Sequence, residues 1–202
     1  MAITNGYATL SEAKARLGIP VADTGDDSII ENIVEAASRQ IDKFCNRQFY
    51  QNVGQVRYYT AASDVLVFID DCVSISAVAT DRNLDRTWST VVAVSDTELA
   101  PLNASVLNFP YTELRMKPLA SNEFDLGLDL IKITGTWGWP AVPDAVNEAC
   151  LLLTSRLFRR KDSPFGVTGG GEVGNQIAIS GVDPDIQNLL APYRKIGLID
   201  LV

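Results

Sequence analysis

Two groups of aspartates are the residues in this sequence best suited to chemistry. Asp70 and Asp71 follow an apolar run, and Asp81 and Asp85 lie in a polar segment that we expect to form a turn. If such carboxylates converged in a pocket, they could hold a divalent cation or act as general acid and base. Aspartates at turns and strand ends are also commonly structural, because they accept hydrogen bonds from nearby backbone N–H groups. A carboxylate-based, metal-dependent enzyme is therefore kept as an alternative.

The other reactive residue types argue against catalysis. The chain has no histidine, so it lacks the commonest general base and cannot form the usual Ser-His-Asp triad. Its cysteines, Cys45, Cys72 and Cys150, are far apart in apolar surroundings, which predicts buried thiols rather than a zinc site. The stretch GGGEVGN at 169–175 lacks the Lys-Ser/Thr pair of a phosphate-binding loop, so we interpret it as a flexible loop. We expect no catalytic residue, no cofactor and no bound metal.

One basic cluster and two tryptophans have structural interpretations. Arg156, Arg159 and Arg160 end a strongly predicted helix, where positive charge suits the helix dipole. A second hypothesis places these arginines at a subunit interface, paired with an acidic neighbour. Trp137 and Trp139 could stack a ligand, but a core or interface anchor is the preferred interpretation.

Length and charge limit the classes of function. The chain has 202 residues, enough for one substantial domain or a small domain with an insertion, and a net charge of −8. This acidity argues against a domain that grips nucleic acid through clustered Lys and Arg, but it suits a channel wall that repels DNA. No apolar run is long enough to cross a bilayer, and the first residues lack the features of a signal peptide. We expect a protein made in the cytoplasm, with no membrane partner.

Apolar spacing and capping residues predict the elements. Helices are expected over 7–17, capped by Thr9 or Ser11, over 26–45, with Asp26 at the N-cap and Asn46 at the C-cap, and over about 144–160. A final short helix is expected to begin with Asp183 as N-cap and Pro184 at its first position. Between the second and third helices the pattern predicts strands over 56–60, 65–69, 73–78, 88–94, 114–116 and 128–134, with 98–122 mostly loop.

These elements predict an α+β fold. It consists of a small bundle of three to four helices with an antiparallel β insertion between helices 2 and 3, and an extended C-terminal arm. The expected boundaries are 1–52 for the N-terminal helical part, 53–134 for the β insertion, 135–162 for the core helix, and 163–202 for a flexible loop and docking arm. The arm ends in an apolar tail, which we expect to dock on its own domain or on a partner.

Four segments together resemble a known family. They are YATLSEAKARLGI, DDSIIENIVEAASRQIDKFCNRQFY, GTWGWPAVPDAVNEACLLLTSRLFRRKDSPFGV and DPDIQNLLAPYRK. In combination they are similar to the tailed-phage head–tail connector proteins, also called adaptors or head-completion proteins, of the gp6/gp15-like type. The strongest parts of the match are IDKFCNRQF at the end of the second helix and the Gly-Trp-Pro-x-Val-Pro entry to the third.

The resemblance implies a structural virion protein. It implies a ring, typically of twelve subunits, located in the neck between the portal protein and a stopper or tail-completion protein, with DNA passing through the channel without specific binding. A tail-side completion protein is an alternative that differs only in its neighbour. Carried over to this chain, the family's C-terminal region gives a portal-docking arm whose expected contacts are Asp183, Ile186, Leu189, Leu190, Tyr193, Arg194, Ile196, Leu198, Ile199 and Leu201.

Overall fold

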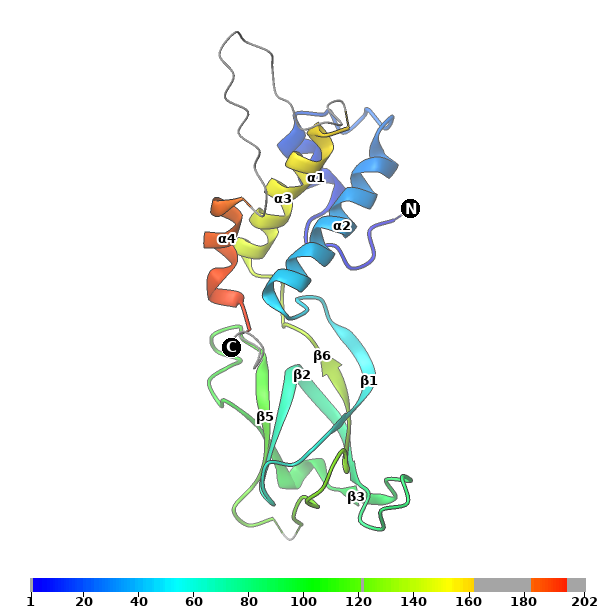
Figure 1. Cartoon of the computed structure of the whole chain (residues 1–202), viewed down its shortest axis with the longest axis vertical. Helices are drawn as coiled ribbons and strands as arrows, with labels where there is room; N and C mark the ends of the chain where they lie inside the picture. Colours follow the sequence, from blue (N-terminus) through cyan, green and yellow to red (C-terminus); the bar gives the residue numbers. More distant parts are fainter. Residues whose placement is uncertain (1, 121, 162–182, 196–202) are drawn as a thin grey trace. The chain divides into compact units, whose positions relative to one another are not determined.

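The computed structural model describes residues 2–120, 122–161 and 183–195, and it divides the chain into two compact units. The helical unit comprises the residues up to Arg47 and those from Val142 onward, and the β unit comprises Gln48–Ala141. In Figure 1 the helical unit is coloured blue and yellow to red, and the β unit is cyan to green. The loop predicted at 169–175 and the apolar tail at 196–202 lie outside the described residues.

The helical unit contains α1 (Leu10–Leu17), α2 (Asp27–Cys45), α3 (Asp144–Arg159) and α4 (Pro184–Leu190), followed by a 3-10 turn at Ala191–Tyr193. α3 contacts each of the other helices and lies between α2 and α4 (Figure 1). The buried residues recur at helical spacing, as the sequence predicted. The centre of this core is formed by Ile30, Val34, Ala37, Ile41, Val146, Ala149, Cys150 and Leu153.

Local capping sets the ends of these helices. Thr9 and Glu12 form a capping box at the start of α1: the Thr9 hydroxyl accepts from Glu12 N–H at 3.2 Å, and the Glu12 carboxylate accepts from Thr9 N–H at 2.7 Å. The predicted start at Tyr7 was therefore wrong, because residues 7–8 form a bend and the helix begins only after the Thr9 cap. Asn46 ends α2 in the left-handed conformation and Asp183 caps α4, as predicted. Asp26 occupies the N-cap position of α2 without making a capping hydrogen bond.

The β unit is a six-stranded antiparallel sheet. Its strands are β1 (Asn52–Tyr59), β2 (Leu66–Thr80), β3 (Thr90–Val92), β4 (Thr97–Ala100), β5 (Tyr111–Met116) and β6 (Ile131–Trp137). They lie in the order β1-β6-β2-β5-β4, with β3 paired to β2. Buried side chains from β2, β3, β5 and β6, with Ala61 and Phe124 from the loops, form the core of this unit. The mixed α and β class predicted from the sequence is confirmed.

Three strand predictions needed correction. The segments 65–69 and 73–78 form one strand, β2, and a register irregularity between Phe68 and Cys72 accommodates the aspartates that were expected to interrupt it. The region 98–122, expected to be mostly loop with short extended pieces, contributes β4, and the strand predicted at 114–116 begins earlier, as β5 at Tyr111. β6 continues past 134 to Trp137, and Gly135 pairs with Ile75. A Cβ atom at Gly135 would lie 2.4 Å from the Ser74 carbonyl oxygen, so this glycine permits the close packing of the two strands.

Candidate functional site

The aspartates at 70 and 71 have separate structural roles. Asp70 is exposed, and its carboxylate accepts hydrogen bonds from Arg57 Nη1 at 2.8 Å and from the Tyr59 hydroxyl at 3.1 Å. Asp71 is buried, and its carboxylate accepts from Trp139 Nε1 at 3.1 Å. The two side chains therefore fasten different parts of the β unit.

The second aspartate group organises a turn. The fully buried Asp81 carboxylate accepts from the backbone N–H groups of Asp85 at 3.1 Å and Arg86 at 2.8 Å. Hydrogen bonds from Thr87 hold the pKa of the exposed Asp85 below its usual value. Across residues 2–120, 122–161 and 183–195, no three His, Cys, Asp or Glu side chains are placed to hold a metal ion. The four aspartates therefore do not converge on a common metal site, which the enzyme alternative requires.

The cysteines are free thiols with buried side chains, as predicted. Burial is the main cause of a raised pKa at each: to about 11 for Cys45 and about 12 for Cys72, with Cys150 also raised. A thiol that stays protonated is a poor nucleophile, so none of the three has the character of a reactive cysteine.

Both tryptophans are core anchors of the β unit, which confirms the preferred interpretation. Trp137 is fully buried, and its indole N–H donates to the Gln55 carbonyl at 2.7 Å. Trp139 lies against Phe49 and Phe109, with ring centroids 5.2 Å away in each case. Neither indole ring is presented for ligand stacking.

The proposed docking arm is partly built into its own bundle. Ile186 and Leu190 are only 2% and 1% exposed, because the apolar side of α4 packs within the helical unit. Their assignment as portal contacts is therefore corrected for this conformation: they fix α4 in place. Asp183 is likewise used locally, since its carboxylate accepts from Asp185 N–H at 3.0 Å.

After α4, the described part of the arm packs beside the C-terminal end of α2. Leu189 and Tyr193 are half-buried, and Arg194 is exposed with its guanidinium 5.8 Å from the centre of the Phe44 ring. Lys195 N–H donates to the Cys45 carbonyl at 2.8 Å. The chain therefore leaves the described region beside the C-terminus of α2. The remaining predicted contacts, Ile196, Leu198, Ile199 and Leu201, lie outside the described residues.

The arginine cluster is located at the end of α3. Arg156 is half-buried, whereas Arg159 and the C-cap residue Arg160 are exposed. The next residue, Lys161, pairs with Asp26 at 2.6 Å. The positive charge at this helix end thus includes two outward-facing guanidinium groups.

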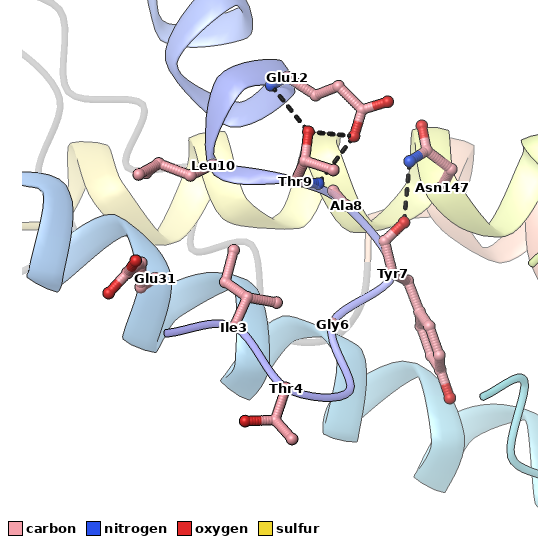
Figure 2. Close-up of a pocket in the computed structure, with 10 residues that line it drawn as sticks. All are labelled: Ile3, Thr4, Gly6, Tyr7, Ala8, Thr9, Leu10, Glu12, Glu31 and Asn147. Carbon is pink, nitrogen blue, oxygen red and sulfur yellow. Dashed lines mark hydrogen bonds between the residues drawn. The ribbon is translucent and has the colours of Figure 1, made fainter. Parts of the chain in front are cut away.

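An open pocket of about 490 Å³ in the helical unit was not predicted. The N-terminal segment Ile3–Leu10 forms most of its wall, with Glu12 from α1, Glu31 from α2 and Asn147 from α3 (Figure 2). The segment is held in place because Tyr7 N–H donates to Ser38 Oγ at 3.0 Å and Asn147 Nδ2 donates to the Tyr7 carbonyl at 2.8 Å. The only signal in the sequence was the presence of apolar Ile3 and Tyr7 ahead of the Thr9 cap.

Comparisons with known proteins agree with the resemblance found in the sequence. Residues 7–100 match the family described as phage gp6-like head-tail connector protein, which confirms that resemblance over those residues. No curated protein sequence matches the chain. No helix within the described ranges is long and apolar enough to span a membrane.

Solved structures of similar fold come from gene transfer agent (GTA) particles. A chain from the neck of an empty GTA particle, computed with C6 symmetry, is 15% identical with a TM-score of 0.59, covering 98% of this chain and 94% of that one. A chain from the virion of a native GTA particle is 15% identical with a TM-score of 0.56, covering 94% and 90%. A chain from a native GTA neck, computed with C12 symmetry, is 16% identical with a TM-score of 0.55, covering 98% and 94%. At this level of identity the likeness shows a shared fold.

Proposed function

We propose that this chain is a structural connector subunit in the neck of a phage-like virion. The observation that carries the proposal is the head-tail connector match over residues 7–100, which spans α1, α2 and the first strands of the β unit. The fold likeness to chains of GTA particles, two of them from the neck, extends over nearly all of the chain and supports the same role. The separate structural uses of Asp70, Asp71, Asp81 and Asp85 support a structural role over the enzyme alternative.

In this role the chain forms an adaptor ring between the portal protein and a stopper or tail-completion protein. The necks of the similar GTA particles, computed with C6 and C12 symmetry, support a ring, and twelve subunits is the number proposed. The net charge of −8 supports a conduit for DNA, because an acidic wall repels phosphate groups rather than binding them.

We assign portal docking to the exposed side of α4 and to the chain that follows it, because the other side of α4 packs on the helical unit. Ile186 and Leu190 hold α4 on the bundle, so the outward contacts are assigned to Leu189, Tyr193 and Arg194 and to the apolar residues after Lys195. The last seven residues, IGLIDLV, contain five large apolar side chains, which would fit an apolar groove on the portal.

The function is tested by producing particles without this chain. The proposal predicts heads that package DNA but do not join tails, with joining restored when the chain is supplied. Intact, infectious particles in its absence would overturn it.

Truncation after Lys195 should reduce portal binding with little change in the free energy of unfolding. Truncation after Ser180 should also destabilise the bundle, because it removes the buried Ile186 and Leu190. Binding to tail components instead of the portal would support the tail-side alternative.

A further inference from the structure

The open pocket of the helical unit carries negative charge, which suits it to bind cationic side chains. Glu12 and Glu31 lie on different sides of it (Figure 2), and no Lys or Arg is among its lining residues. Thr4, Thr9 and Asn147 add further polar groups at its wall. A carboxylate can accept about four hydrogen bonds, so Glu12 retains acceptor capacity beyond the contacts it makes with Thr9.

The Glu12 carboxylate is also held in its charged form. Hydrogen bonds from the backbone and side chain of Thr9 are the largest causes of a pKa below its usual value. The negative charge is therefore present over the neutral pH range. The capping box fixes Glu12 in position as well, so this wall of the pocket is preorganised.

The same chain carries an exposed cationic group suited to such a pocket. Arg159 and Arg160 lie at the end of α3, and within the described residues neither guanidinium group forms a hydrogen bond or ion pair. Arginine is well suited to this contact, because its planar guanidinium can donate two parallel hydrogen bonds to a carboxylate. None of the residues that line the pocket belongs to the last turn of α3, so the pocket and the arginines are formed by different residues of the subunit.

We propose that the pocket lined by Glu12 and Glu31 receives Arg159 and Arg160 of a second copy of this chain. This inference rests on the proposed connector ring and identifies an interface within it. A contact between two different surfaces is heterologous, which is the type that closes into a ring when the rotation fits. Charge complementarity favours this occupant, since copies with a net charge of −8 repel each other except where a basic group meets an acidic one.

Paired charge reversals test the interface. Glu31→Arg and Arg160→Glu should each raise the concentration needed for ring assembly by about tenfold or more, because like charges then face each other at every interface. The double variant Glu31→Arg/Arg160→Glu restores opposite charges at every interface and should recover most of the loss. Lys43→Glu, an exposed basic residue in the last turn of α2, is the matched control and should leave assembly unchanged.

The measurement is the mass distribution of the purified chain, alone and with its portal protein, as a function of concentration. Thermal unfolding of each variant separates loss of assembly from loss of fold, and Glu31→Gln provides a second, milder variant. Normal assembly of both single reversals, or no recovery in the folded double variant, would overturn the interface. Loss of DNA binding by Arg160→Glu with normal assembly would also overturn it. Failure of the unaltered chain to assemble even with its portal would instead count against the connector ring itself.

Discussion

The helical unit and the β unit differ in how many large apolar side chains they expose. The helical unit buries polar groups at its core: Lys14 is 2% exposed, and Ser38 and Thr154 are almost fully buried. The β unit also buries polar groups, among them Thr80 and Asp81. Its surface differs, however, because large apolar side chains are exposed there: Leu102, Val106 and Leu107 are 61%, 80% and 63% exposed. Among the described residues, the exposed large apolar side chains all belong to the β unit except Val21 and Ile29.

This difference suggests that the two units contact other proteins in different ways. The surface of the helical unit offers charged groups, such as Glu31 and Arg160, whose pairing is specific but weak for each pair when exposed to solvent. The β unit offers apolar loops, and clustered exposed apolar side chains commonly mark protein interaction surfaces. Both units contain buried polar contacts, and the β unit also depends on close backbone packing at Gly135 and Gly138. Each of the following predictions tests one of these supports.

Gly138→Ala should have the largest effect, because it breaks the backbone packing of the β unit. Gly138 has a φ of +114°, and a Cβ atom there would lie 2.0 Å from the Tyr50 carbonyl oxygen. We expect the free energy of unfolding to fall by about 3 kcal/mol or more. Gly18→Ala is the control in the helical unit: its φ is +73°, but nothing lies within 4 Å of the added Cβ, so a loss of about 1 kcal/mol is expected. Equal losses at the two positions in denaturant unfolding would contradict this explanation.

Lys14→Met tests the buried polar support of the helical unit. Lys14 Nζ donates to the carbonyls of Val21 and Asp23 at 3.0 and 2.5 Å and to the Asp27 carboxylate at 2.7 Å. Removing the cation leaves these acceptors without it, so we expect a loss of about 2–3 kcal/mol in the free energy of unfolding. The control Arg16→Met removes an exposed pair with Glu148 and should cost less than about 1 kcal/mol. The account of Lys14 fails if calorimetry finds the two variants equally stable.

The buried thiols of both units should make the free energy of unfolding depend on pH above pH 9. Burial raises the pKa of Cys45 in the helical unit to about 11 and that of Cys72 in the β unit to about 12, from a usual value of 9.0. Between pH 9 and 11 the unfolded chain therefore binds fewer protons than the folded chain, and stability falls as pH rises. At pH 10 the expected loss is on the order of 1 kcal/mol for each thiol.

Denaturant unfolding at pH 8, 9 and 10 measures this slope. Replacing Cys45 or Cys72 with Ala should reduce the slope, whatever the effect of the substitution on stability at pH 8. Rapid labelling of either thiol by a soluble disulfide reagent in the folded protein would show that the side chain is accessible and would remove the basis of the prediction.

Thr9→Ala should have the smallest effect. It removes the capping box of α1, which costs about 1 kcal/mol in comparable helices. Ser11→Ala is the matched control, because Ser11 lies inside α1 and makes no cap. The sequence left Thr9 and Ser11 as alternative caps, and thermal unfolding of these two variants distinguishes them: a larger loss at Ser11 would contradict the observed cap.

The parts that were predictable from the sequence are those fixed by neighbouring residues. The apolar stripe of α2, the left-handed Asn46 and the Asp183 cap depend on spacing and capping over a few positions, and each was found where expected. The head–tail connector resemblance was likewise visible in local segments and is matched over residues 7–100.

The parts that were not predictable depend on distant partners. Asp71 appeared to end a strand because its partner, Trp139, is far away in the chain. The requirement for glycine at position 135 comes from Ser74, which is distant in the sequence and which the sheet places against it. The pocket requires the N-terminal segment to fold onto α2 and α3 through Tyr7, and no sequence periodicity encodes that contact.

The most direct test of the connector role is the native mass of the purified chain mixed with the portal protein of its own particle. The account predicts a portal complex carrying a closed ring of this chain, with twelve copies as the proposed number. A chain that remains monomeric and unbound at every portal concentration tested would contradict it.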